Sequence, residues 1–140
     1  MGSNRITNVT DPTGDQDAAT KAYVDATING LDVKESVRVA TTTNLGTTYS
    51  SNVLTASANG VLSVDGITSW TVGDRILVKD QVSPNEEHNG IYTVTNAGSV
   101  SAAYILSRAT DANTGAKLTG GAFFFVEEGS NNSDNGYVMT

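Results

Sequence analysis

Short runs of alternating apolar and polar residues dominate the chain after Leu31, and they constrain its fold more than any other feature. Val37 and Val39 are two residues apart, and Ile76 and Val78 recur at the same spacing. A two-residue period places successive side chains on opposite faces of an extended strand. Further strand candidates are the compact runs 91–94, 104–106, 123–126 and 137–139. These runs predict a mainly β domain.

Glycine-containing turn signals separate the strand candidates. Asn59-Gly60, Asn89-Gly90 and Asn135-Gly136 are dipeptides that type I′ hairpins prefer, and Asp65-Gly66 is a further turn signal. Hairpins join antiparallel strands. The sequence therefore predicts an antiparallel β-sandwich or barrel-like domain.

Two strand candidates near the end of the chain carry more specific expectations. Residues 123–126 are apolar at every position, which predicts a central strand covered on both faces. The chain stops at Thr140 just as the strand 137–139 begins. We expect either that the sequence is a fragment or that this last strand pairs with a neighbouring chain.

One helix is expected before the strands, from about Asp15 to Asn29, after an extended arm. Thr13 and Gln16 fit a capping box, in which each side chain accepts from an unpaired backbone N–H of the first turn. The two parts divide the chain into an N-terminal arm and helix over residues 1–30, for oligomerisation or attachment, and a β-domain over residues 31–140.

The apolar residues of this helix bear on assembly. Val24, Ile28 and Leu31 step by four and then by three, which is the spacing of a coiled-coil seam. A seam of about one heptad is too short to be stable by itself. The pattern alone leaves two interpretations open: the helix packs on its own β-domain, or it associates with copies of itself.

Composition excludes several classes of partner and chemistry. The 140 residues fit one domain and include no cysteine, so disulfides and thiolate–metal sites are excluded. Lys and Arg total 8 and are scattered, the net charge is −7 and the pI is about 4.4. Nucleic-acid binding usually needs a concentrated basic surface. We therefore expect neither nucleic-acid binding nor membrane insertion, and no secretion signal is recognised.

Three features of the sequence are candidates for sites of chemistry. His88, the single histidine, is interpreted as a solvated loop residue rather than a general base or metal ligand. The adjacent carboxylates Glu86-Glu87 and Glu127-Glu128 are interpreted as charges on solvent-facing edges rather than a glycosidase dyad. Residues 111–115 resemble the opening of a calcium loop, but its twelfth position is Ala122 instead of Glu. No catalytic, cofactor-binding or metal-binding residue is predicted, and we expect no enzyme.

Aromatic residues offer one further possibility. Trp70, Tyr92 and Tyr137 could stack on sugars, but aromatics within strands are more often core or interface residues. Trp70 and Tyr137 are kept as the candidate glycan contacts.

Two stretches of the sequence carry a family resemblance. Residues 6–28, ITNVTDPTGDQDAATKAYVDATI, resemble a repeat of phage tail-fibre proteins whose helix reads close to DAATKAYVD, and Asp17–Asp25 match those nine residues without departure. LDVKESVRVATT, VGDRILVKDQ, NGIYTV, SRATDA and GGAFFFVEEGSNNSDNGYVMT resemble a β-domain that often follows this helix. Relatives often carry Trp near Tyr104 and at Tyr137, and they continue beyond Thr140.

The resemblance implies a structural protein of the bacteriophage virion, made in the host cytoplasm and located in the tail. Fibres of this kind are homotrimers, so the resemblance favours the seam interpretation of Val24, Ile28 and Leu31. The domain would serve as shaft, connector or adaptor and contact other tail or baseplate proteins. The alternative is a receptor-binding module that contacts host surface glycans. A glycan-cleaving enzyme is disfavoured, because fibre enzymes usually have longer β-solenoid bodies.

Overall fold

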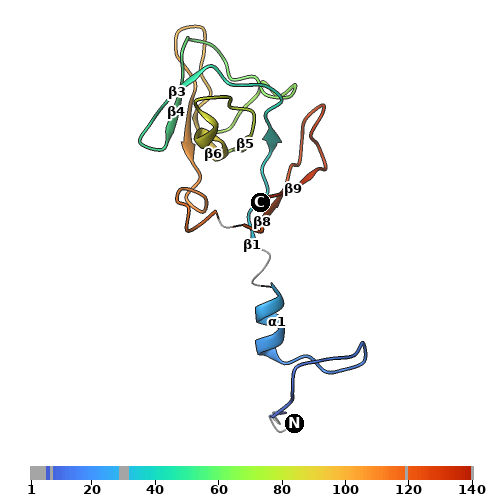
Figure 1. Ribbon diagram of the computed structural model, residues 1–140. Helices are drawn as coiled ribbons and strands as arrows, with labels where there is room; N and C mark the ends of the chain where they lie inside the picture. The colour runs from blue at the N-terminus through green and yellow to red at the C-terminus, as the bar shows by residue number, and fades with distance from the viewer. Residues whose placement is uncertain (1–5, 7, 29–31, 119, 140) are drawn as a thin grey trace. The chain divides into compact units, whose positions relative to one another are not determined.

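The computed structural model describes residues 6, 8–28, 32–118 and 120–139 (Figure 1). The chain divides into two compact units, residues 1–32 and residues 33–140. The described part of the first unit holds helix α1 (Lys21–Ile28). The strands are β1 (Asp32–Val33), β2 (Val39–Ala40), β3 (Thr47–Ser50), β4 (Val53–Ala56), β5 (Arg75–Val78), β6 (Gly90–Asn96), β7 (Ile105–Arg108), β8 (Ala122–Phe125) and β9 (Gly136–Val138). A short 3-10 helix, η1 (Glu86–His88), precedes β6.

The strands form two sheets, which confirms the predicted mainly β class of sandwich-like architecture. The larger sheet has the order β2-β5-β6-β7-β4-β3, and the smaller has the order β1-β8-β9. Most pairs are antiparallel, but β2 pairs with β5 in parallel, with Val39 opposite Ile76. The chain leaves β2 at one edge, forms the β3–β4 pair at the other edge and returns to β5. That long connection allows the parallel pair.

The β3–β4 hairpin was not predicted from the sequence. Its first strand, Thr47–Ser50, consists of hydroxyl-bearing residues only, so no apolar run marks it. Ser51 and Asn52 connect the strands with φ angles of 50° and 67°, and Ser50 lies opposite Val53. Two consecutive positive φ angles are the signature of a type I′ turn.

The predicted Asn-Gly hairpin turns are wrong. Asn89 has an extended backbone with a φ of −61°, and Gly90 is the first residue of β6. No positive φ occurs at the other two Asn-Gly pairs. The Asn89 side chain instead binds a neighbouring backbone, because its Oδ1 accepts from the Gln81 N–H at 2.9 Å. Asp65-Gly66 does form the expected tight turn, with φ angles of 44° and 86°.

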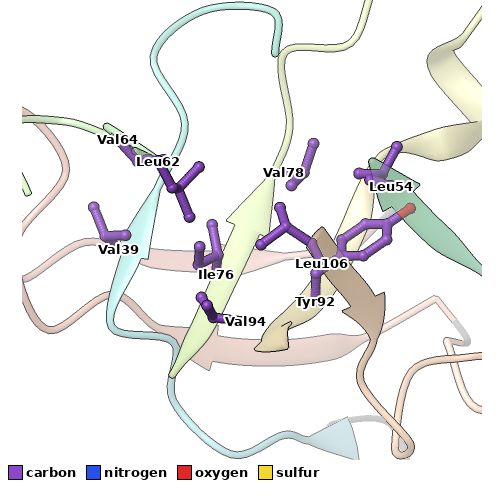
Figure 2. Packing of buried hydrophobic residues seen from close by; sticks show 9 residues of the cluster. All are labelled: Val39, Leu54, Leu62, Val64, Ile76, Val78, Tyr92, Val94 and Leu106. Carbon is purple, nitrogen blue, oxygen red and sulfur yellow. The ribbon is translucent and has the colours of Figure 1, made fainter. Parts of the chain in front are cut away.

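Two hydrophobic clusters cover the two faces of the larger sheet. Alternation along β5 and β6 sends Ile76 and Tyr92 into the first cluster and Leu77 and Ile91 into the second. Figure 2 shows the first cluster, in which side chains from β2 and β4–β7 meet those of the segment before Trp70. Its buried members are Val39, Leu54, Leu62, Val64, Ile76, Val78, Tyr92, Val94 and Leu106. The second joins the larger sheet to β8 and contains Val37, Ala40, Leu77, Ile91, Ala109, Ala112, Phe124 and Val126.

Strand β8 is central in its sheet, as predicted, but it is not covered on both faces. Phe124 is 1% exposed and faces the second cluster, whereas Phe125 is 54% exposed. Alternating side chains point to opposite faces of a strand, so the face that bears Phe123 and Phe125 is turned away from this cluster. Apolar residues on both faces of a strand show that each face can be buried. They do not show whether other segments of the same chain cover it.

The helix begins later than its predicted start at Asp15. Residues 14–17 form a turn in which the Asp17 carboxylate accepts from the N–H groups of Thr13 and Gly14 at 2.9 and 2.8 Å. The capping residue is Thr20, whose Oγ1 accepts from the Tyr23 N–H at 3.0 Å. The predicted capping box is therefore wrong, because the Asp17 side chain offers the backbone a competing turn. The extended arm is not confirmed, and the predicted helix end at Asn29 lies outside the described residues.

Candidate functional site

An exposed apolar face on the smaller sheet is the main candidate for a functional surface. Phe123, Phe125 and Val138 form this phenylalanine face. Phe123 lies opposite Val138, and the rings of Phe123 and Phe125 contact edge to face, with their centroids 4.8 Å apart. Phe125 and Val138 are 54% and 55% exposed. Exposed apolar side chains that cluster in this way are typical of surfaces that bind another molecule.

A glycine on β9 leaves room for one of the phenylalanine rings. Gly136 lies opposite Phe125, and a Cβ at Gly136 would lie 2.9 Å from a carbon of the Phe123 ring. The ring therefore rests on the backbone of β9. Strand β9 is also an edge of its three-stranded sheet, and Val33 on the opposite edge strand is 65% exposed. Edge strands are the positions at which sheets pair with other chains.

The predicted helical seam is only partly within the described residues. Val24 is 39% exposed, and its neighbour Tyr23 is 40% exposed. Leu31 and the side chain of Ile28 lie outside what the structure describes. The seam through Val24, Ile28 and Leu31 therefore stays a prediction.

The two candidate glycan contacts pack against different clusters. Trp70 packs against the first cluster and donates from Nε1 to the Leu62 carbonyl at 2.7 Å. Tyr137 packs against the second cluster, where its hydroxyl donates to Oδ1 of Asn132 at 2.8 Å. Its ring is stacked with Phe124 at a centroid distance of 6.2 Å. Trp70 and Tyr137 are therefore not brought together as one sugar-stacking surface.

The carboxylate pairs are exposed, and one of them anchors an ion-pair cluster. Arg38 contacts Asp74 at 2.7 Å and Glu128 at 3.1 Å. Glu127 accepts a hydrogen bond from the hydroxyl of Ser36. The guanidinium of Arg38 also lies 5.5 Å from the centre of the Trp70 ring. These contacts link Arg38, the residue before β2, to Trp70, Asp74 and Glu128. We therefore interpret this cluster as stabilising the fold.

His88 is not the solvated loop residue that was expected. Its ring stacks on Tyr49 with centroids 4.1 Å apart, and its side chain is 17% exposed. Its carbonyl accepts from the Tyr92 hydroxyl at 2.6 Å. Burial raises the pKa of Tyr92 to about 12, although the positive charge of Arg108 acts in the opposite direction. The sequence around His88 is polar and does not predict this contact, because the stacking partner Tyr49 lies far away in the sequence.

In the segment that resembles a calcium loop, side-chain oxygen atoms accept hydrogen bonds from cationic side chains. Both carboxylate oxygens of Asp111 accept from Arg75, at 3.0 and 2.9 Å, and Oδ1 of Asn113 accepts from Lys117 Nζ at 3.1 Å. Burial acts to raise the pKa of Asp111, but the hydrogen bond and charge of Arg75 outweigh it and lower that pKa. Within the described ranges, no three His, Cys, Asp or Glu side chains could hold a metal ion together. No described helix has the length and apolarity to span a bilayer.

A buried carboxylate forms a network that the sequence did not reveal. Asp65 accepts from the backbone N–H of Asn132 at 2.9 Å and from its side-chain amide at 3.0 Å. Asn131 donates to it as well, from its backbone at 3.0 Å and from its side-chain amide at 2.6 Å. Burial acts to raise the pKa of Asp65, but the hydrogen bonds from Asn131 and Asn132 outweigh it and lower the pKa. This network ties the tight turn at 65–66 to the loop before β9.

Comparison of the chain with protein-family models, with curated proteins and with solved structures found no match.

Proposed function

We propose that this chain is a structural domain of a tailed-phage tail fibre, or of another tail-attached protein, and that it assembles as a homotrimer. It serves as shaft, connector or adaptor between other tail or baseplate proteins. The virion part of this proposal rests on the match of Asp17–Asp25 to the tail-fibre repeat. The assembly part rests on one geometric observation, the exposed phenylalanine face.

The chemistry of this face favours a further copy of the chain as its partner. Phe123, Phe125 and Val138 carry no charge, so copies that each carry a net charge of −7 can meet there without placing like charges opposite one another. A closed ring of identical copies hides such a face on every subunit. Burying apolar surface contributes about 25 cal/mol per Å², which gives association its driving force.

A charge placed on the face tests the assembly. In Phe125→Asp, a buried charge without a partner would face each neighbouring copy, and we expect the assembly to dissociate. Phe125 is 54% exposed, so the variant should keep its fold by circular dichroism. Val100→Asp is the matched control, because Val100 is 95% exposed, lies in the turn between Ser99 and Ala102, and is not one of the residues of this face. Equal oligomer masses for the two variants would refute the role of the face.

The helical seam is tested separately. The resemblance places Val24 and Ile28 around a threefold axis, so Val24→Asp combined with Ile28→Asp should lower the oligomeric state measured by light scattering. A double variant that keeps its native mass would remove the seam from the proposal and leave the phenylalanine face.

The proposal assigns the chain no catalytic role. Glu86, Glu87, Glu127 and Glu128 are exposed, and Glu128 is held by Arg38. Purified protein should therefore release no reducing ends from bacterial surface polysaccharide. Release of reducing ends that scales with protein concentration would replace the structural proposal by an enzymatic one.

A further inference from the structure

Among the described residues of the β-unit, two cations lack the carboxylate partner that other cations have. Arg38, Arg75 and Lys79 each contact a carboxylate at 3.2 Å or less. Arg108 and Lys117 contact only uncharged oxygen atoms within the described part of the chain. A half-buried guanidinium without a counter-charge is costly to desolvate, so it is a natural receptor for an anion.

Arg108 is also held in a fixed position. Its Nη2 donates to the Glu87 carbonyl at 2.7 Å and its Nε donates to the Tyr49 hydroxyl at 3.4 Å. The guanidinium lies 5.1 Å from the centre of the Tyr92 ring and 5.8 Å from that of Tyr49. A Cβ at Gly90 would overlap Nη1 of Arg108, so the glycine makes room for the guanidinium. A charge that is already immobilised loses little entropy when it binds a ligand.

An open pocket of about 350 Å³ lies beside this guanidinium. Its walls come from the β3–β4 hairpin, from the segment around Glu87, from the end of β7, and from residues 112–115 with Leu118. A second positive charge, that of Lys117, is bound to a residue that lines the pocket: its Nζ donates to Asn113 Oδ1 at 3.1 Å, and also to the Thr110 carbonyl at 2.6 Å. Asp111 does not neutralise the pocket, because Arg75 binds both of its carboxylate oxygens.

Two uncharged side chains that line the pocket, Asn52 and Asn113, can act as donors. The Oδ1 atoms of Asn52 and Asn113 already accept, from the Tyr49 hydroxyl at 2.9 Å and from Lys117, which leaves both Nδ2 groups to donate. The carboxylate that lines the pocket belongs to Glu87, and its side chain is 73% exposed. A Glu carboxylate repels a multiply charged anion but accepts well from a hydroxyl group. The combination fits a ligand that carries one carboxylate and several hydroxyls.

We propose that this pocket binds a sugar that carries a carboxylate, such as a hexuronate residue. The ligand carboxylate pairs with Arg108 and is attracted by Lys117, while its hydroxyls meet the amides of Asn52 and Asn113 and the carboxylate of Glu87. Leu118 gives the sugar C–H groups an apolar contact. This site is distinct from Trp70 and Tyr137. It does not rest on the fibre assignment, because the test reads ligand binding and not subunit mass.

The direct test is a titration of the full chain with D-glucuronate, followed by amide and arginine side-chain signals in NMR spectra. We expect saturable shifts at Arg108 Nε and around Asn52 and Asn113, and binding of D-glucose at least ten times weaker. Sodium acetate and inorganic phosphate serve as the anion probes. Equal binding of glucose, equal binding of either anion, or no binding of glucuronate would each overturn the proposal.

Charge variants of exposed side chains keep the proposal falsifiable without a substitution of the half-buried Arg108. Lys117→Gln changes an exposed side chain and should weaken glucuronate binding at least threefold. Lys79→Gln is the matched control, because it removes the same charge from a pair with Asp80 outside the pocket. Glu87→Gln removes the one carboxylate that lines the pocket and should allow phosphate to bind more tightly. Equal weakening by Lys117→Gln and Lys79→Gln would assign the effect to net charge and overturn the site.

Discussion

At the scale of single residues, Asp65 shows how a polar side chain can stabilise a loop that lies far away in the sequence. Its carboxylate gathers donors from Asn131 and Asn132, which follow it by 66 and 67 positions. The sequence predicts the turn at Asp65-Gly66, because that signal is local. It does not predict the partners, because nothing in either segment specifies that the two meet.

Replacing Asp65 by Asn should destabilise the fold. The variant loses a charged acceptor and turns an amide toward other donors, which we expect to lower the free energy of unfolding by about 2 kcal/mol. Urea unfolding at pH 7 measures the change. Asp134→Asn is the control, since Asp134 also has a positive φ, of 62°, but is exposed. Equal effects of the two variants would contradict the role of the network.

The lowered pKa of Asp65 also predicts a dependence of stability on pH. The folded-state pKa lies below the ordinary value of 3.8, so the contribution is fully present above about pH 4. It is lost as the pH falls through the folded-state pKa. The pKa of Asp111 is lowered too, so Asp65→Asn should reduce the acid destabilisation without abolishing it. Urea titrations between pH 7 and pH 2 test this, and an unchanged slope would contradict it.

Two glycines that look equivalent in the sequence should respond differently to alanine. Gly66 has a φ of 86°, and an added Cβ would lie 2.6 Å from the Ser130 hydroxyl, so Gly66→Ala should cost about 1 kcal/mol or more. Gly60 has no atom within 4 Å of an added Cβ and no positive φ. Gly60→Ala should therefore be neutral within error in thermal unfolding. A larger loss at Gly60 would contradict the assigned turn geometry.

At the scale of elements, the helix start shows the limit of a local signal. The sequence favours Thr13 as the cap, whereas the structure places Thr20 there, and both residues precede good helix formers. Which of two possible capping residues starts a helix depends on small differences in free energy. Here the Asp17 carboxylate closes the earlier turn and decides the outcome.

The two threonines therefore provide a matched test of the cap. Thr20→Ala removes the acceptor for the Tyr23 N–H and should cost the helix about 1 kcal/mol. Thr13→Ala should leave the helix unchanged, because the Thr13 backbone N–H keeps its bond to Asp17. Helical circular dichroism of the full chain, or hydrogen exchange at Tyr23, distinguishes them. A larger loss in Thr13→Ala would restore the original capping box.

The strands were easier to predict where apolar residues recur, and β5 to β9 all coincide with runs seen in the sequence. The β3 strand was missed because its residues carry hydroxyl groups. Strand β8 was placed correctly, but the cover of its second face was not. Periodicity gives the faces of a strand, whereas the partner of each face depends on contacts between distant segments.

Neighbouring phenylalanines on β8 should behave in opposite ways. Phe124 is 1% exposed, so Phe124→Ala should lower the free energy of unfolding by about 3–5 kcal/mol. Phe125→Ala should cost less than about 1 kcal/mol in a dissociated subunit, because its ring is half exposed there. Denaturant unfolding at low protein concentration separates the two. Similar losses would mean that the phenylalanine face is covered within one subunit.

At the scale of the whole molecule, the proposed assembly rests on a sequence resemblance and on an exposed apolar surface. The predicted functional residues are not gathered into one site: Trp70 and Tyr137 pack on separate clusters, and only Val24 of the seam has a described side chain. The phenylalanine face and the Arg108 pocket became visible only in three dimensions. The first depends on which apolar side chains stay exposed, and the second on which cation has no carboxylate partner. Neither can be predicted from the sequence alone.

The proposed homotrimer is tested by the solution mass of the full chain, measured by light scattering after size exclusion. We expect a single species of three times 14.5 kDa. A folded species of 14.5 kDa at every concentration would contradict it.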